Sequence, residues 1–264
     1  MKVGFIGLGK QGKYLAANIA RSGFELTVFD LNAKAVGELV SLGAKAARSP
    51  GDLAALSDAI LICVRDDGQL HSVLNDSDGV VGSLRRGSTV VIHSTVSPST
   101  IAAQAERIHQ KGCQLIDAPV SGGEKGAIGR TMSYMVGGSS ETLERCRPIF
   151  EASGTKITHT GPLGTATQAK LVHQIVISGN MLAAYEGVRV GLAAGLSKET
   201  IIKVLSEGVA QSKIADNWFD LSLRPHSIPV FYKDLELCLD FAHELGIPVP
   251  GAALAQQLIE EIVP

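Results

Sequence analysis

The sequence predicts an α/β domain over residues 1–162, followed by an all-helical domain over residues 163–264. Two observations predict this order. Short runs rich in Val and Ile alternate with helical patterns as far as Gly161, which is typical of a largely parallel sheet covered on both faces. After Gly161 the strand signals stop and only helical patterns remain. We expect a long helix over about residues 165–195 to lead into the second domain.

Seven strands with helix-like segments between them are expected in the first domain. The strands are Val3–Ile6, Leu26–Phe29, Ala59–Val64, Thr89–His93, Leu115–Asp117, Tyr134–Val136 and Lys156–Thr160. The helix-like segments include Gln11–Arg21, Ala33–Leu42, Gln69–Leu74, Pro98–Gln110 and Glu141–Phe150. Helix-end signals agree with this, because Gly23, Gly43 and Gly112 stand where C-terminal glycines belong and Ser97-Pro98 is typical of a helix start.

The long helix of the second domain is apolar nearly all round, which predicts a buried helix roughly 45 Å long at 1.5 Å per residue. Shorter helices follow it. Ser197 can cap a helix that ends at Gly208, and apolar residues at helical spacing from Leu235 to Ala242 mark another that ends at Gly246. A last helix is expected near residues 252–261.

Composition excludes several classes of protein. The chain has 264 residues, 45% hydrophobic and 19% charged, as expected of a soluble globular protein. Its net charge of −2 gives no reason to expect a nucleic acid or an anionic membrane as partner. No signal peptide or membrane-spanning run is visible. The four cysteines form no C-x-x-C pair, so we expect reduced thiols, no metal site and a cytoplasmic protein.

A glycine motif opens the first domain. Gly7-Leu8-Gly9-Lys10-Gln11-Gly12 fits G-x-G-x-x-G, follows an expected strand and begins an expected helix. Gly7 permits a tight turn, Gly9 lets a pyrophosphate approach the backbone, and Gly12 allows close packing of helix on strand. The N-terminus of the helix then offers N–H groups to the phosphates. The motif predicts a Rossmann-type dinucleotide site.

Asp30 ends the second expected strand, 23 residues after Gly7. A carboxylate there accepts hydrogen bonds from ribose hydroxyls and repels a 2′-phosphate, and no Arg follows it. We therefore expect NAD, with NADP less favoured. Val64 and Arg65 follow the third strand, and we expect their backbone to contact the cofactor. His93 lies in an apolar strand, where a packed histidine is expected rather than a catalytic base.

A second glycine-rich element, from Asp117 to Gly123, leaves a strand and has Ser121-Gly122-Gly123 at its tip. Backbone N–H groups and a hydroxyl in such a turn can hold a small carboxylate, although an ordinary loop remains an alternative. Lys170 lies near the start of the long apolar helix. In a polar cleft its amine can act as general acid and base, with Gln174 one turn further on, but extension to solvent is also open.

With these motifs in view, the chain resembles the β-hydroxyacid dehydrogenases over nearly its whole length. The resemblance rests on four motifs in the family's order: Gly7–Gly12, Asp117–Gly123 with Gly126-Ala127, Gly161–Gln174 around Lys170, and Lys233-Asp234-Leu235. It implies an NAD-dependent oxidoreductase that converts a small 3-hydroxy acid to a semialdehyde or keto acid, or the reverse. It also implies a homodimer or homotetramer.

The resemblance implies a role for each matching residue. Ser121, Gly122 and Gly123 would hold the substrate carboxylate, with Gln174 as a further substrate-binding residue, and Lys170 would be the acid and base. Lys233 would reach both cofactor and substrate. Thr95 would lie against the nicotinamide, and Val64 and Arg65 against the adenosine side.

The chain departs from the family in places. Gln174 stands where the family usually has Asn, Arg65 replaces an apolar residue, the segment 218–231 looks short, and the chain stops early after residue 261. Two alternatives stay open: an imine-type reductase on the same fold, against which Lys170 argues, and a dinucleotide-binding sensor or scaffold without turnover.

Overall fold

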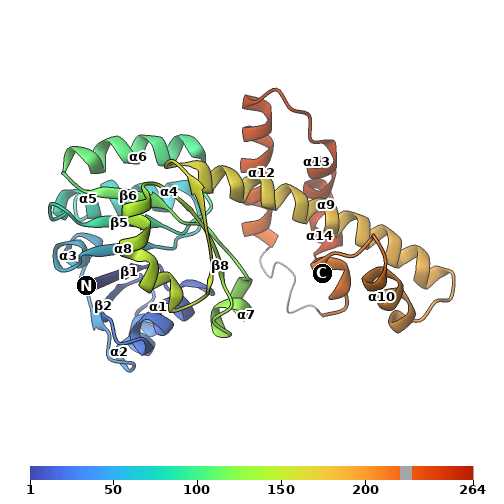
Figure 1. Ribbon diagram of the computed structural model, residues 1–264, viewed down its shortest axis with the longest axis horizontal. Coiled ribbons are helices and arrows are strands. Elements are labelled where there is room, and N and C mark those ends of the chain that lie inside the picture. Colours follow the sequence, from blue (N-terminus) through green and yellow to red (C-terminus); the bar gives the residue numbers. More distant parts are fainter. Residues whose placement is uncertain (221–227, 264) are drawn as a thin grey trace. The chain divides into compact units, whose positions relative to one another are not determined.

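The computed structural model describes residues 1–220 and 228–263. Its internal contacts divide the chain into two units, Met1–Lys170 and Leu171–Pro264 (Figure 1). Residues 221–227, the middle of the segment that looks short against the family, lie outside the described residues. Within the described part of the chain, no helix is both long and apolar enough to cross a membrane.

The first unit is built on a parallel sheet, as the sequence predicts. Its core strands are β1 (Lys2–Ile6), β2 (Glu25–Phe29), β4 (Ala59–Ile62), β5 (Thr89–Ile92) and β6 (Gln114–Asp117). They lie in the order β2-β1-β4-β5-β6, and every neighbouring pair is parallel. From β1 the strand order runs through β2 toward one edge of the sheet, and from β4 it runs through β5 and β6 toward the other edge. The strand order therefore reverses between β1 and β4, and open α/β sheets bind ligands at such a switch point.

Four further strands complete this sheet. Strand β8 (Ser133–Gly137) pairs antiparallel with β6, and β9 (Lys156–Gly161) pairs parallel with β8. All seven predicted strands are therefore present. Two were not predicted, β3 (Lys45–Ala46) beside β2 and β7 (Val120–Ser121) beside β8. Each is only two residues long, which is too short for an alternating pattern to mark it.

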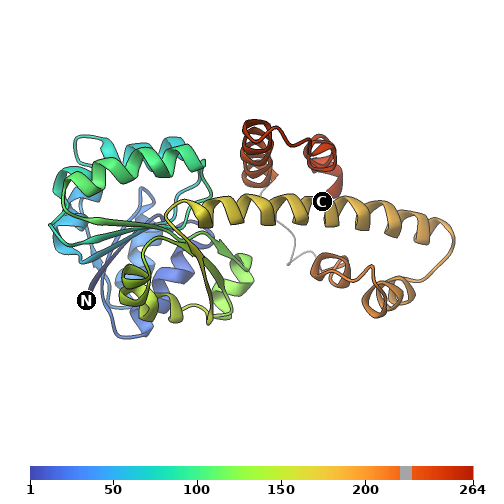
Figure 2. The same ribbon diagram turned by 45° about the horizontal axis from the view of Figure 1, so that its top comes forward.

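Helices cover both faces of the sheet (Figure 2). Successive strand residues point to opposite faces, so Leu61 belongs to one core cluster while Ile60 and Ile62 belong to the other. The first cluster is covered by α1 (Gly12–Arg21), α2 (Ala33–Val40), α7 (Gly123–Ile128) and α8 (Ser140–Glu151). The second is covered by α3 (Pro50–Leu56), α4 (Asp67–Asn75), α5 (Val80–Ser83) and α6 (Pro98–Gln110).

The predicted helix ends are confirmed. Gly23, Gly43 and Gly112 have φ of +84°, +95° and +70°, the left-handed conformation of a helix C-terminus. Ser97 caps α6, because its Oγ accepts a hydrogen bond from Thr100 N at 3.1 Å, and Pro98 opens the helix.

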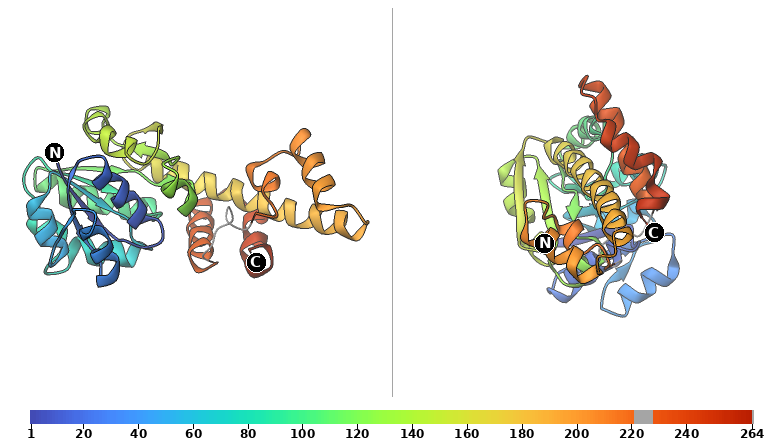
Figure 3. Two further views of the ribbon diagram at one scale, coloured as in Figure 1. Left: turned by 90° about the horizontal axis from the view of Figure 1, so that it is seen from below. Right: turned by 90° about the vertical axis from the view of Figure 1, so that its right-hand side faces the viewer.

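The second unit is helical. Helix α9 (Thr165–Ala193) begins in the first unit and continues into the second. It is followed by α10 (Lys198–Glu207), α11 (Lys213–Asp216), α12 (Ile228–Glu244), α13 (Pro250–Gln257) and α14 (Ile259–Ile262). One core cluster joins Met181 of α9 to residues of α12–α14, and another joins α9 to α10 and α11. Figure 3 shows the ribbons of these helices from two further sides.

The expectation that α9 is buried all round is wrong for the single chain. Met181 is fully buried, but the side chains of Val172, Val176 and Val190 are 55%, 56% and 70% exposed. The reason is geometric. The shorter helices pack against α9 in two separate groups, α12–α14 and α10–α11, and within the described chain these groups leave Val172, Val176 and Val190 exposed.

Candidate active site

The residues predicted to bind a cofactor follow the carboxyl ends of adjacent parallel strands. Gly7 follows β1, Asp30 follows β2, Val64 follows β4, and Thr95 follows β5. Because the carboxyl ends of parallel strands meet at one edge of a sheet, these four positions share the edge beside the β1–β4 switch point.

The three glycines of the first motif have different environments. Gly7 has φ +93°, and a Cβ there would lie closer than 3.0 Å to the backbone of Cys63, the turn that follows β4. A Cβ on Gly12 would collide with the Gly7 carbonyl oxygen, so only glycine lets α1 start this close to the loop. Gly9 is exposed and has no atom within 4 Å of a Cβ position. The open side of the loop therefore lies at Gly9, as a pyrophosphate would require.

The other predicted residues of the motif divide by exposure. Leu8 is buried in the core that includes α1, and its backbone N–H is taken by Asp30. Lys10 is exposed and Gln11 is half-buried at the start of α1. Gln11 makes no side-chain capping bond to the helix. The N–H groups of the first turn of α1 can thus serve an anion.

Asp30 connects the glycine loop to α2. Its Oδ2 accepts a hydrogen bond from Leu8 N at 2.6 Å, and its Oδ1 accepts one from Asn32 N at 2.7 Å. Asn32 in turn caps α2 by accepting from Lys34 N at 3.1 Å. A carboxylate has about four acceptor positions, so these two bonds leave capacity for ribose hydroxyls while they hold its orientation.

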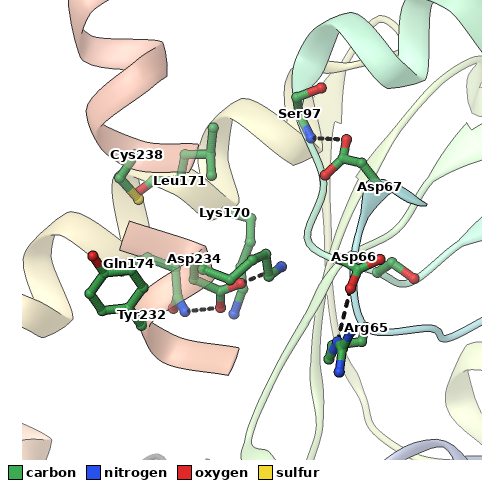
Figure 4. Close-up of polar contacts among 12 residues, drawn as sticks. Arg65, Asp66, Asp67, Ser97, Lys170, Leu171, Gln174, Tyr232, Asp234 and Cys238 are labelled. Atoms are coloured by element: carbon green, nitrogen blue, oxygen red, sulfur yellow. Dashed lines mark hydrogen bonds and ion pairs between the residues drawn. The ribbon is translucent and has the colours of Figure 1, made fainter. Parts of the chain in front are cut away.

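The loop after β4 is held by its own side chains. Val64 N donates to Ser94 Oγ at 2.9 Å, which links the ends of β4 and β5. Arg65 forms an ion pair with Asp66 at 2.8 Å, and Asp66 caps α4 by accepting from Gln69 N (Figure 4). Asp67 accepts from Ser97 N at 3.0 Å. Both aspartates therefore have partners within the protein. Together with the bond from Val64 N to Ser94, their contacts hold the loop that contains Val64 and Arg65.

His93 is packed, as predicted. Its Nδ1 donates to the Ala118 carbonyl oxygen at 2.7 Å, and its ring contacts those of Phe5, Tyr134 and Phe150. Burial lowers the pKa of His93 to about 4, so the ring is neutral at pH 7 and holds the loop after β6 in place.

The segment from Ser121 to Gly123 forms an open turn between β7 and α7. Gly122 and Gly123 have φ of +139° and +61°, a conformation that favours glycine at both positions. A Cβ on Gly122 would press on the sulfur of Met132, whereas Gly123 is exposed with nothing within 4 Å of a Cβ position. The geometry suits close approach of a ligand to the backbone at Gly123.

The side chain of Lys170 extends toward this turn. Its Nζ donates a hydrogen bond to the Val120 carbonyl oxygen at 3.0 Å, one residue before Ser121, and the residue is only 8% exposed. The sequence left open whether Lys170 extends to solvent, and the structure decides against that alternative. A buried amine therefore lies beside the turn in which a substrate carboxylate was expected.

In the second unit, Gln174 and Lys233 share one partner. Asp234 accepts a hydrogen bond from Gln174 Nε2 at 2.7 Å (Figure 4) and forms an ion pair with Lys233 Nζ at 2.7 Å. Gln174 and Asp234 are both buried. The carboxylate takes one of the two N–H groups of the amide, and the amide oxygen of Gln174 lies 3.3 Å from the Nδ1 of His173.

The sequence predicts no role for Asp117 or Asp234, which are both buried carboxylates with several partners. The sequence did contain a signal that each of these carboxylates is buried and hydrogen-bonded. Asp117 ends an apolar strand, and Asp234 sits on the apolar face of its helix, where a charge is costly unless it is hydrogen-bonded. In the described residues, no group of three His, Cys, Asp or Glu side chains is placed to hold a metal ion.

A parallel sheet with a glycine-rich turn at its switch point and an acidic residue after β2 defines a dinucleotide-binding protein, and the buried lysine beside a second glycine turn suits an oxidoreductase. Comparison with known families agrees. Residues 2–161 match the family described as the NAD binding domain of 6-phosphogluconate dehydrogenase, and residues 164–263 match the family described as NAD-binding of NADP-dependent 3-hydroxyisobutyrate dehydrogenase.

Individual proteins are similar over almost the whole chain. The 2-hydroxy-3-oxopropionate reductase of Escherichia coli is 35% identical over 98% of this chain and 90% of its own length. The NAD-dependent L-serine dehydrogenase of Pseudomonas aeruginosa is 36% identical over 82% of this chain and 71% of its own. The crystal structure of 3-hydroxyisobutyrate dehydrogenase from Salmonella typhimurium superposes with a TM-score of 0.87 at 29% identity, covering 99% of this chain and 93% of that one.

The chain belongs to the β-hydroxyacid dehydrogenase family. It is an NAD-linked oxidoreductase that transfers a hydride to or from a small 3-hydroxy acid. Family membership favours this oxidoreductase function over the imine-reductase and sensor alternatives, and the presence of Lys170 is consistent with that function.

Proposed function

We propose that the enzyme oxidises a short 3-hydroxy acid, or reduces the corresponding semialdehyde, with Lys170 as the general acid and base. The observation that carries this proposal is the hydrogen bond of 3.0 Å from Lys170 Nζ to the Val120 carbonyl oxygen. That bond places the amine next to the turn of Ser121, Gly122 and Gly123. A substrate carboxylate held by this turn would bring its 3-hydroxyl within a few ångströms of the amine.

The residues around the glycine loop fit NAD. The backbone of Gly7–Gly12, open at Gly9, would hold the pyrophosphate, and Asp30 would accept from the ribose hydroxyls. Val64, Arg65 and Thr95 complete the proposed contacts of the first unit, and Lys233 contributes one from the second. When bound, NAD supplies the acceptor for the hydride that leaves the hydroxyl-bearing carbon.

Proton handling falls to this chain's own residues. In the oxidative direction, the amine of Lys170 takes the hydroxyl proton and becomes an ammonium as the carbonyl forms; in the reductive direction it returns that proton. Gln174 is proposed to hydrogen-bond the substrate through its amide group, because the bond to Asp234 takes only one of its two N–H groups. Lys233 is proposed as a further substrate-binding residue.

The chemical class of substrate follows from the relatives. Their names specify 2-hydroxy-3-oxopropionate, L-serine and 3-hydroxyisobutyrate, which are all short acids with an oxygen function at C3. We propose a substrate of this size. Gln174, one methylene longer than Asn, leaves slightly less room beside the hydroxyl and favours the shorter acids of the class.

The test is a panel of 3-hydroxy acids with NAD or NADP, followed as NADH or NADPH formation at 340 nm. We expect turnover of at least one short acid with NAD. The variant Lys170→Ala should lose about 10²–10⁴-fold in kcat while it still binds NADH, since general acid and base catalysis is worth that factor. Wild-type turnover by this variant would show that the lysine is not the acid and base.

We also propose a homo-oligomer in which a second copy covers the exposed face of α9. Val172, Val176 and Val190 lie on this face, spaced by whole turns of the helix. Light scattering should report a dimer or tetramer, and Val176→Glu should shift the protein toward the monomer; an unchanged mass would refute the role of this face. Thiols at all four cysteines, three of them buried, fit a cytoplasmic location.

A further inference from the structure

Asp117 ends β6 and reaches the start of α9, 47 residues further along the chain. Its Oδ1 accepts a hydrogen bond from Gly164 N at 2.8 Å, and its Oδ2 accepts one from Thr167 N at 2.7 Å. The carboxylate is fully buried. It caps the first turn of α9 as a side chain from a distant strand, and it places a negative charge at the positive end of the helix dipole.

The same segment also binds the helix one turn further on. Lys170 comes three residues after Thr167, on the same side of α9, and its Nζ donates to the carbonyl oxygen of Val120, which comes three residues after Asp117. The segment from Asp117 to Val120 and the first two turns of α9 are therefore joined at two points. One point holds the backbone of the helix and the other holds the amine.

The contact at Asp117 depends on a glycine in the neighbouring strand. A Cβ on Gly137 would collide with Asp117 Oδ1 and would lie 3.0 Å from both Ala166 N and the Pro162 carbonyl oxygen. The φ of Gly137 is not in the left-handed region, so space alone requires glycine at this position. Strand β8 is thus shaped to let the carboxylate meet the helix.

We infer that Asp117 is a positioning residue, which sets the height and rotation of α9 on the sheet and thereby places Lys170 Nζ beside the Ser121–Gly123 turn. This inference rests on the proposed function, because it assumes that Lys170 is the acid and base. A lysine side chain has four rotatable bonds, so its amine is placed well only if its backbone is fixed. A displacement of about 1 Å at a reacting group can cost about 10²-fold in rate.

The experiment is a double-mutant cycle with Asp117→Asn and Lys170→Ala. The Asn side chain has nearly the same shape, but its amide nitrogen is a donor and can satisfy only one of the two N–H groups. We expect Asp117→Asn to lower kcat about 10–100-fold, with the Kd for NADH within about twofold of wild type. Asp117→Ala should lower kcat further, and Gly137→Ala should reproduce the loss from the other side of the contact.

The cycle separates positioning from general damage. If Asp117 acts through Lys170, Asp117→Asn should cause little further loss of kcat once Lys170 is already Ala, because coupled sites are not additive. The same 10–100-fold loss in both backgrounds would overturn the inference. Ser139→Ala is the matched control: Ser139 caps α8 with Thr142 N at 3.2 Å, so its loss should lower the melting temperature but leave kcat unchanged.

A chemical readout keeps the inference distinct from the proposed function. Acetylation of Lys170 by acetic anhydride, followed by peptide mass spectrometry, reports how well the amine is held, whether or not the enzyme turns over. We expect labelling of Lys170 to rise several-fold in Asp117→Asn and to stay at the wild-type rate in Ser139→Ala. Unchanged labelling in Asp117→Asn would overturn the inference, whereas loss of the proposed function would show as full turnover by Lys170→Ala.

Discussion

Adding one methyl group at Gly9 or at Gly12 should separate cofactor binding from folding, although the two residues are three positions apart. At Gly9 a Cβ would have no atom within 4 Å, and the residue is exposed. At Gly12 a Cβ would lie closer than 3.0 Å to the carbonyl oxygen of Gly7 and 3.3 Å from the Phe5 ring. Only the Gly12 methyl therefore meets the protein itself.

The two expected magnitudes follow from these surroundings. Gly12→Ala forces backbone apart, since no rotamer can relieve contact with a carbonyl, and such overpacking costs about 3 kcal/mol at its upper range. For a unit of this size that lowers the melting temperature by about 6–12 °C. Gly9→Ala should leave the melting temperature within about 2 °C but obstruct the pyrophosphate. Losing one hydrogen bond to a charged group costs about 1.5–3 kcal/mol, or about 10–150-fold in Kd.

The assay is NADH binding by fluorescence titration beside thermal unfolding of each variant. Gly37→Ala is the control for a harmless methyl group, because Gly37 is exposed within α2 and has open space around it. It should raise stability by about 0.5–1 kcal/mol and leave the Kd unchanged. The reasoning is refuted if Gly9→Ala binds NADH as wild type does, or if it melts as early as Gly12→Ala.

Two further predictions concern the sheet edge. Replacing Asp30 with Ser removes the carboxylate that would repel a 2′-phosphate, so the ratio of kcat/KM for NADP to that for NAD should rise about tenfold or more; a wild type that already prefers NADP would contradict the assignment. Burial lowers the pKa of His93 from 6.5 to about 4, so the unfolded state binds more protons between these values. The neutral ring's contribution of about 3 kcal/mol is therefore fully present above pH 6.5 and is lost as the pH falls toward 4. Urea unfolding of His93→Asn should show a flatter dependence on pH across this range, and an unchanged slope would show that His93 is not responsible.

Local patterns were sufficient for most of the architecture. Buried strands such as β4 and β5 are continuous apolar runs, and helix ends carry a Gly or a Ser-Pro pair, so seven strands and five helices of the first unit followed from near neighbours in the chain. Helices α3, α5 and α7, of seven residues or fewer, were not predicted. The glycine motif was also predictable from the sequence, because its function depends on backbone geometry within six residues. The short strands β3 and β7 were missed, since two residues hold no period and form only where a neighbouring strand offers hydrogen bonds.

The candidate site likewise combines features that local sequence predicts with features that depend on tertiary structure. Sequence patterns identified the groups available for chemistry: a phosphate-binding turn, an acidic residue after β2, a second glycine turn and a lysine in an apolar helix. It left open whether Lys170 extended to solvent. Tertiary structure decided that question by bringing Val120, 50 residues away in the chain, within 3.0 Å of the amine, and it made Asp117 the cap of α9. The physical reason is that a hydrogen bond between distant residues depends on the packing of strands and helices, which no local pattern of side chains encodes.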